Sequence, residues 1–562
     1  MRNSGMFFYR KRLIILFALL QTFAVAAETP DVLQVALLNR AGGIAQFTRL
    51  TTDGQVERLP LESSLQTPLG SLWKLFVYAY AVDRKLPDPG YTCQGNDKEE
   101  VYCCSQKGER IDRDTALVRS CGLYFSPDRL GMDAKAWREY WQSRTIPASL
   151  LELSAVTPAT TVDVQALLQA LKDLPAQQQA RVVLLDVLLS PHHPDLVADL
   201  GGRLRVKTWS WYRNQNPKQR IGGFAGWLND GSPLWAAGQG VSADILAKYS
   251  HALDSFLPVA AAQMGPDNCV DVNLFARYPI TAVYGSHKQV TDSGVLRGAY
   301  NLQFANGNTI GIESAGDIML SRRQEKLLLR TRMSREEYVA RVLDREASAT
   351  PLQAARALAI TARSYLLQNA ARDGECLLVD DSSASQRVAP RPASEAARAV
   401  AAWTADVVMT GSAVNYHLDT PGPNRLVWRD AVAKANNGMR FDAILRQAFP
   451  RNSLASWQKP ASACDSLADA EEWLKRRLPR WRELLDSEPG YAETTLFSVC
   501  RLQAGNPHVD KNSRRIFVRS VLSQQDRLDI THEYLHLAFE AYPSGQDENY
   551  VEHLARRLLL EL

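Results

Sequence analysis

The order of apolar and polar residues predicts six strands and a helix in the first half of the chain. Short runs that alternate or are rich in β-branched residues are separated by Gly and Asp, as in antiparallel sheets. Six such runs are DVLQVALLN, GIAQFTRLTT, QVERLPL, RLRVKTWSWYR, IGGFAGWLND and SPLWAAGQ. The run ADILAKYSHALDSFL follows with the spacing of an amphipathic helix. We therefore expect a mixed α/β domain over residues 28–262.

The middle of the chain, residues 263–458, combines a hairpin pattern with two helical patterns. YNLQFANGNTIGIES places Asn306 and Gly307 between two strand-like runs, which is a strong hairpin signal. KLLLRTRMSREEYVARVLDREA predicts a strand and then a helix that begins at Ser334, with Glu337 placed to complete a capping box. An Ala-rich run from Leu352 predicts a long, well-packed helix.

The last part of the chain, residues 459–562, has one strand-like run and two helical runs. RRIFVRSVLS predicts a strand that could form the edge beside a substrate. The helical runs lie within RLDITHEYLHLAFEAYPSGQDENYVEHLARRL. We therefore expect a small helical domain at this end.

The first 27 residues have the layout of a secretory signal. Basic residues precede the apolar run LIILFALLQTFAVA, which ends in small residues before a cleavage point near Ala27. No later run reaches the roughly 18 apolar residues that a spanning helix needs. We expect a periplasmic or secreted protein without a membrane span once the signal is removed.

Cysteine content and charge narrow the class of protein further. Four of the eight cysteines lie between Cys93 and Cys121, which predicts local disulfides whose pairing the sequence leaves open. The net charge is only +4 over 562 residues, and like charges form no long run. These features exclude nucleic acid as an expected partner, so a substrate must be sought in a specific site.

The stretch TPLGSLWKLFVYAY places Ser71 and Lys74 three residues apart on one face of a predicted helix. A serine hydroxyl needs a base within hydrogen-bond reach to act as a nucleophile, and Lys74 is such a base. A serine at a helix start can also serve only as a cap. Further along the chain, ALVRSCGLYF contains Ser120, and RVKTWSWY contains Lys207 and Thr208.

These three motifs, in this order, resemble the penicillin-binding protein and serine β-lactamase superfamily. The resemblance implies that Ser71 is the acylated nucleophile, Lys74 its base and Ser120 a proton relay. It further implies that Lys207 and Thr208 clamp a substrate carboxylate. Two residues depart from the pattern. Trp209 replaces a glycine where its ring could block the substrate edge of the strand, and Gly122 replaces the usual third residue of the middle motif.

The run EEYVARVLDREASATPLQAARALAITARSYLL resembles the stage II sporulation protein D family of lytic transglycosylases and amidase enhancers. VNYHLDTPG and NNGMRFDAILRQAFP resemble later segments of that family. The resemblance implies that Glu346 is the acid that protonates the leaving oxygen of a glycosidic bond. An ordinary surface salt bridge is the other interpretation of Glu346. The Cys/His metal-binding segment of the family is missing here, although Cys376 is present.

His532, Glu533 and His536 form an H-E-x-x-H motif near the C-terminus. On a helix the two histidines share a face and can hold one Zn²⁺, while the glutamate can serve as general base. The segment resembles zincin metallopeptidases whose third ligand is a glutamate on a second helix. We expect Glu548 to be that ligand and Glu552 to orient a histidine. The reverse assignment and His553 remain open, as does a helix interface in which the histidines hold no metal.

The expected architecture is multidomain α/β and α+β: a serine β-lactamase/DD-peptidase-like domain, a sporulation protein D-like domain and a small helical zincin-like domain. The whole resembles exported proteins encoded near bacterial α2-macroglobulin homologues, which implies an α2-macroglobulin-like partner. We expect a periplasmic protein that acts on peptidoglycan or peptide substrates. The alternative is a non-catalytic binding or assembly protein built on degenerate enzyme folds.

Overall fold

The computed structural model describes most of the chain after the N-terminal segment. The described residues are 31–39, 45–95, 98–104, 107–189, 194–212, 216, 219–259, 268–285, 288–323, 326–373, 375–383, 385–411, 413–422, 424–450, 452–458, 467–494, 497–502, 507–510, 515–540 and 542–560. The expected signal peptide over residues 1–27 lies outside them. No helix among the described residues is long and apolar enough to cross a membrane.

The first sheet is built from the six predicted strands, which are all confirmed. They are β1 (Val32–Leu38), β2 (Ala45–Thr51), β3 (Val56–Leu59), β8 (Leu204–Tyr212), β9 (Arg220–Leu228) and β10 (Pro233–Gln239). The strand order is β3-β2-β1-β10-β9-β8, with antiparallel neighbours throughout. Strands from the two ends of this segment therefore meet at the centre, where β1 pairs with β10, and β8 is left at an edge.

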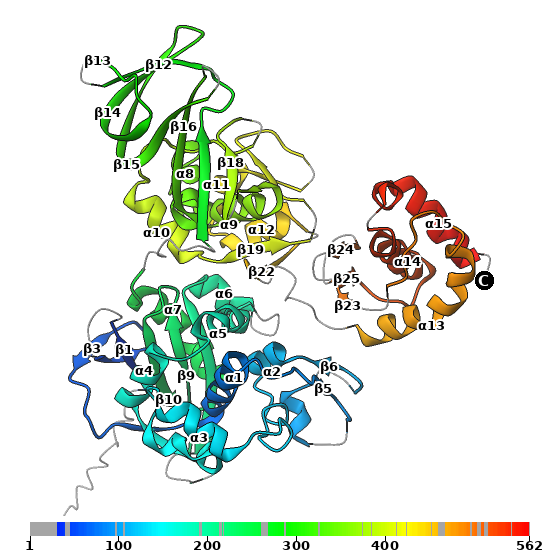
Figure 1. Ribbon diagram of the computed structural model, residues 1–562. Coiled ribbons are helices and arrows are strands. Elements are labelled where there is room, and N and C mark those ends of the chain that lie inside the picture. Colours follow the sequence, from blue (N-terminus) through cyan, green and yellow to red (C-terminus); the bar gives the residue numbers. More distant parts are fainter. Residues whose placement is uncertain are drawn as a thin grey trace, which may run out of the picture.

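Helices cover both faces of this sheet (Figure 1). One apolar core joins the sheet to α1 (Trp73–Asp83) and contains Trp209 and Trp235, and a second joins it to α7 (Ser242–Phe256). The remaining helices of the segment are α2 (Arg113–Arg119), α3 (Ala134–Gln142), α4 (Val164–Lys172), α5 (Gln177–Leu184) and α6 (Pro194–Leu200). Two short strand pairs, β4 (Gln66–Pro68) with β7 (Thr161–Asp163) and β5 (Tyr91–Thr92) with β6 (Arg110–Ile111), complete it.

The second sheet has eight strands in the order β13-β12-β14-β15-β16-β11-β18-β17. Their bounds are β11 (Cys269–Leu274), β12 (Ile280–Gly285), β13 (Lys288–Gln289), β14 (Gly294–Phe304), β15 (Thr309–Arg323), β16 (Lys326–Ser334), β17 (Ala371–Asp373) and β18 (Cys376–Asp380). The predicted hairpin joins β14 to β15, and Gly307 has the positive φ of 83° that its turn requires. A disulfide joins Cys269 of β11 to Cys376 of β18.

Two helices predicted from the sequence, α8 (Arg335–Glu346) and α9 (Leu352–Asn369), pack on this sheet. Ser334 caps α8 by accepting a bond of 3.2 Å from the backbone of Glu337. The Glu337 carboxylate instead accepts from Arg341, Arg398 and the backbone of Ala393, so only half of the expected capping box is seen. The elements beyond them are α10 (Glu395–Trp403), β19 (Val407–Thr410), β20 (Asn415–His417), β21 (Arg425–Val427), α11 (Trp428–Asn436), α12 (Phe441–Ala448) and β22 (Ser453–Ser456).

The C-terminal part is a small α/β unit with a three-stranded sheet, so the expectation of a small, mainly helical domain is not confirmed. Helices α13 (Ala468–Leu485), α14 (Gln524–Ala538) and α15 (Glu548–Leu560) surround a sheet of β23 (Ser498–Arg501), β25 (Arg515–Val518) and β24 (His508–Asp510) (Figure 1). The expected edge strand, β25, is the central strand. Ile516 and Val518 of β25 enter the core, and both of its edges are paired.

A half-buried carboxylate ties the first sheet to the middle of the chain. Asp406 accepts a hydrogen bond of 2.9 Å from Arg205 of β8 and another from Arg335, the first residue of α8. Both arginines are almost fully buried. Burial would raise the pKa of Asp406, but the charges of Arg335 and Arg205 outweigh that effect and hold it well below the usual range.

Replacing this carboxylate tests whether the ion pairs hold the two parts together. We predict that Asp406→Asn lowers the free energy of unfolding by about 3 kcal/mol, because buried Arg205 loses its carboxylate partner and buried Arg335 keeps only Glu336. The depressed pKa makes this contribution fully present at neutral pH and removes it as the pH falls below about 4. Chemical denaturation at pH 7 checks the effect. Glu57→Gln at the exposed Arg49–Glu57 pair is the control and should change stability little; equal effects would contradict the prediction.

Candidate functional site

Ser71 and Lys74 are brought together where a short 3-10 helix, η1 (Gly70–Leu72), runs into α1. The Lys74 amine donates to the Ser71 hydroxyl over 3.1 Å and to the Ser120 hydroxyl over 3.2 Å. It also donates to the Ser120 carbonyl over 2.7 Å. Lys74 is buried, and this burial lowers its pKa to about 8 against the opposing effect of the Glu99 charge. A usable fraction of the amine is therefore unprotonated near neutral pH, as a general base requires.

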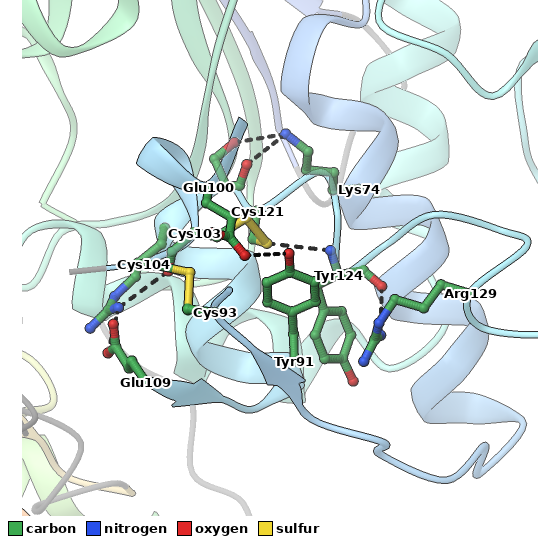
Figure 2. Close-up of a disulfide and its surroundings, with 12 residues drawn as sticks. Lys74, Tyr91, Cys93, Glu100, Cys103, Cys104, Glu109, Cys121, Tyr124 and Arg129 are labelled. Carbon is green, nitrogen blue, oxygen red and sulfur yellow. Dashed lines mark hydrogen bonds and ion pairs between the residues drawn. A yellow bond between two sulfur atoms is a disulfide. The ribbon is translucent and has the colours of Figure 1, made fainter. Parts of the chain in front are cut away.

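Ser120 owes its position to the end of α2 and to a disulfide. It is the C-cap of that helix, in the left-handed conformation with φ of 66°. The next residue, Cys121, is bonded to Cys103, while the neighbouring Cys104 is bonded to Cys93. Figure 2 shows Lys74 beside the Cys103–Cys121 bond. The predicted local disulfides are thus confirmed, and they fix the loop that carries Ser120.

A close backbone contact sets the distance between Ser71 and strand β8. Gly70 has a φ of 47°, and a Cβ atom at this position would lie 2.8 Å from the carbonyl oxygen of Ser210. Only glycine fits both the conformation and the space. Ser71 therefore lies beside Ser210 of β8, at the edge of β8 that pairs with no described strand. Ser210 is two residues beyond Thr208 on that strand.

Lys207 lies beneath the site and not at its surface. Its side chain is fully buried, and its amine donates to the carbonyl of Thr208 over 3.0 Å. Burial, and then the charge of Lys74, lower the pKa of Lys207 well below its usual value. A fully buried amine that donates to a backbone carbonyl is not presented at the surface, so the carboxylate clamp implied for Lys207 stays a prediction. Thr208 remains partly exposed on the same strand.

The Trp209 ring is part of the core and does not lie over the strand edge. It is 1% exposed and stacks on Trp235 with ring centres 6.3 Å apart. Gly122 lies next to Lys74. A Cβ at this position would lie 3.7 Å from the Lys74 side chain and 4.0 Å from a carboxylate oxygen of Glu99. The missing side chain therefore leaves space between Lys74 and Glu99. Sequence reasoning missed Glu99, which no motif marks.

Glu346 is the last residue of α8 and is held in a salt bridge. Its carboxylate accepts bonds from the backbone and the guanidinium of Arg387 over 2.8 and 2.9 Å. The Glu346 side chain is largely covered. Burial raises the pKa of Tyr416, and the nearby negative charge of Glu346 raises it further. The carboxylate is engaged as an ion-pair acceptor, which agrees with the salt-bridge interpretation.

His532, His536 and Glu548 form a cluster in which potential metal-ligating atoms all lie within 4.8 Å of one another. The Nε2 atoms of the two histidines are 3.1 Å apart, and the Glu548 carboxylate is 3.1 Å from His532 and 3.6 Å from His536. Atoms bound tetrahedrally to one zinc ion are separated by about 3.3 Å, because zinc bonds to nitrogen and oxygen are near 2.0 Å. The spacing fits such an ion.

The outer ring nitrogens determine which atoms face the centre of this cluster. His536 Nδ1 is 2.8 Å from the carbonyl oxygen of Gly545, and His532 Nδ1 is 3.1 Å from the Glu552 carboxylate. Both partners are acceptors, so a neutral ring at either position would donate its proton from Nδ1 and turn an unprotonated Nε2 inward. Two lone pairs and a carboxylate thus converge, which is an arrangement that a cation stabilises.

The two acids of α15 have the geometry expected of them, Glu548 at the centre and Glu552 behind His532. Glu552 also accepts a bond of 2.9 Å from Arg556. Glu533 is buried on α14 beside His532, and His553 is exposed on α15 outside the cluster. Sequence reasoning missed the Gly545 carbonyl that orients His536, because backbone acceptors leave no trace in residue type.

The chain is similar to known proteins along its whole length. A model described as "Predicted secreted protein (DUF2300)" matches residues 95–218 and 424–544, and one described as "Stage II sporulation protein" matches residues 323–412. The uncharacterized protein YfaQ of Escherichia coli (strain K12) is 48% identical over 552 residues, which is 98% of this chain and 100% of YfaQ. The chain therefore belongs to the family of YfaQ. The first description confirms the expectation of a secreted protein.

The solved structures similar to part of the chain include a penicillin-receptor domain and a β-lactamase. The C-terminal domain of the Bacillus licheniformis BlaR penicillin-receptor is 15% identical, covering 40% of this chain and 91% of that one, with a TM-score of 0.25. FUS-1 (OXA-85), a class D β-lactamase from Fusobacterium nucleatum subsp. polymorphum, is 13% identical, covering 40% and 90%, with a TM-score of 0.27.

The effect of the Glu99 charge on the pKa of Lys74 can be tested without any enzymatic activity. We predict that Glu99→Gln lowers the pKa of Lys74 below about 8, because the ammonium form loses a nearby negative charge. Mass spectrometry of acetic anhydride labelling at increasing pH measures this value, since only the neutral amine reacts. The exposed Glu62→Gln variant is the control. An unchanged or raised midpoint in Glu99→Gln would contradict the account of the site.

Proposed function

We propose that this secreted member of the YfaQ family is a hydrolase of peptide or cell-wall amide bonds, with its catalytic centre at His532, His536 and Glu548. The observation that carries the proposal is the convergence of the Nε2 atoms of His532 and His536 with the Glu548 carboxylate. Two neutral nitrogens and one carboxylate match the ligand set of catalytic zinc sites. A bound zinc ion would polarise the scissile carbonyl and favour ionisation of water at neutral pH.

The residues around the centre have separate tasks in this proposal. His532, His536 and Glu548 would hold the ion, while Glu552 and the Gly545 carbonyl fix the two rings. Glu533 takes a proton from the attacking water and delivers it to the leaving amine. Because α14 and α15 supply all of these side chains, the packing of two helices sets the geometry of the site.

A second candidate function, acyl transfer at Ser71, is favoured by a different observation. Lys74 is bonded to both serine hydroxyls, and its pKa of about 8 suits a base that works near neutral pH. Attack of the Ser71 oxygen on an amide carbonyl would form an ester and release an amine, with Lys74 and Ser120 relaying the proton. Thr208 and the edge of β8 are available to a substrate backbone. Stem peptides of peptidoglycan and β-lactams carry the amide that this chemistry needs.

The remaining expectations have weaker support in the geometry. The Arg387 salt bridge at Glu346 engages the carboxylate that glycan cleavage in the middle of the chain would need as an acid. An α2-macroglobulin-like partner stays a prediction from resemblance. Non-catalytic binding or assembly is the outcome that follows if both candidate centres fail the tests below.

The metal centre makes a prediction about content as well as activity. We expect the purified protein to hold one zinc ion, and His532→Ala or His536→Ala to lose it, as measured by plasma mass spectrometry. Glu533→Gln should keep the metal and reduce hydrolysis of peptide or peptidoglycan substrates at least about a hundredfold. Glu548→Gln should weaken zinc binding more than Glu552→Gln, because the second glutamate only orients a ligand.

His553→Ala is the matched control, since this histidine lies on α15 outside the cluster, and the variant should retain both zinc and activity. Stoichiometric zinc in a protein that lacks both His532 and His536 would place the metal elsewhere and remove the assignment. Bound zinc with no hydrolysis of either substrate class would instead leave a structural metal site.

The serine centre makes an independent prediction. A β-lactam or fluorophosphonate should add its mass to Ser71, and the labelling rate should rise as the pH passes about 8, because the neutral form of Lys74 is the base. Intact-mass measurements at several pH values check both points. Ser71→Ala should abolish the label, and a label that persists in this variant, or a native protein that stays unlabelled, would exclude acyl transfer.

A further inference from the structure

An arginine-rich stripe runs along the exposed side of α13. Trp473, Arg476, Arg477 and Arg480 occur at spacings of three, four and seven residues, so they share one helix face. The adjoining face carries the apolar residues that enter the C-terminal core, among them Leu474 and Trp481, and the Trp473 ring packs against Trp481 with ring centres 6.1 Å apart. The Arg477 guanidinium lies over the Trp473 ring at 4.7 Å, which holds it in the stripe.

A second element extends the charge of this stripe. Arg527 lies in the first turn of α14, which packs against α13. Burial lowers the pKa of Arg477, and the charges of Arg527, Arg480 and Arg476 lower it further, so these side chains are near enough to act on one another. Among the described residues, Glu472 forms an ion pair with Arg476 of the stripe over 3.7 Å. Both of these side chains are 69% exposed. The surface therefore holds an excess of positive charge from four guanidiniums.

An exposed leucine stands beside these arginines. The side chain of Arg527 donates to the carbonyl of Val521 over 3.2 Å, which ties the turn before α14 to the stripe. The next residue, Leu522, is 85% exposed, the highest exposure among the large apolar residues of the described chain. A free phosphate or a soluble polyanion would gain nothing from an aliphatic side chain in this position. The interface of a bilayer would accept it while the arginines meet the headgroups.

We propose that the stripe and Leu522 form a docking surface for an anionic phospholipid membrane. The guanidiniums bind lipid phosphates, in a geometry that suits their paired N–H groups. Leu522 enters the boundary between headgroups and acyl chains. Docking would hold the C-terminal unit at a membrane surface without a spanning helix.

Vesicle sedimentation of the mature full-length protein tests this surface. Binding is expected to vesicles of phosphatidylethanolamine with phosphatidylglycerol, to weaken as salt is added, and to be absent with phosphatidylcholine alone. The Arg476→Ser and Arg480→Ser double variant should bind about twenty-five times more weakly, given about fivefold for each arginine. Leu522→Ser should bind about tenfold more weakly.

The double variant Arg429→Ser and Arg446→Ser is the matched control, because its two arginines are about as exposed and lie on α11 and α12. An equal loss in this control would mean unspecific attraction and overturn the proposal. Failure to bind either kind of vesicle would also overturn it. Full binding by Leu522→Ser, together with competition by inorganic phosphate, would identify a soluble-phosphate site in place of a membrane surface. Circular dichroism of each variant confirms that it is folded.

Discussion

The candidate metal site of the C-terminal unit depends on two imidazole rings whose Nε2 atoms are held close together. The Nε2 atoms of His532 and His536 are 3.1 Å apart, and the carboxylate of Glu548 closes the triangle. Acceptors so close repel unless something positive lies between them. The outer partners, Glu552 and the Gly545 carbonyl, keep both rings in this orientation. Either a metal ion or a shared proton must supply the positive charge, and the ligand spacing favours the metal.

In the N-terminal site the main constraint is the burial of two lysine amines. Lys74 and Lys207 are both removed from solvent, and Lys74 lowers the pKa of Lys207 further. Lys74 keeps a titratable amine because the Glu99 charge opposes part of the burial effect. Sites in which a lysine must act as a neutral base adjust its pKa by burial and by neighbouring charges in this way. The two disulfides near Ser120 hold the loop that carries Ser120 in place beside Lys74.

Much of the fold could be predicted because local signals agreed with the final packing. The strand alternation of β1 and β8, the Asn306-Gly307 turn and the start of α8 all follow from short-range rules. The central position of β25 and the burial of Trp209 could not be predicted, since each depends on pairing with distant segments. For the sites, motif spacing predicted that Ser71 meets Lys74 and that His532 meets His536. Glu99, Arg387 and the Gly545 carbonyl reach their sites only through tertiary structure, so no spacing marks them.

The most direct measurement of the central claim is an anomalous difference map from crystals of the protein, recorded above and below the zinc absorption edge. The account predicts one peak, present only above the edge, about 2 Å from both Nε2 atoms and from a Glu548 oxygen. Density without an anomalous peak, with His532 and His536 in direct hydrogen-bond contact, would show that a proton occupies this position and would contradict the zinc centre.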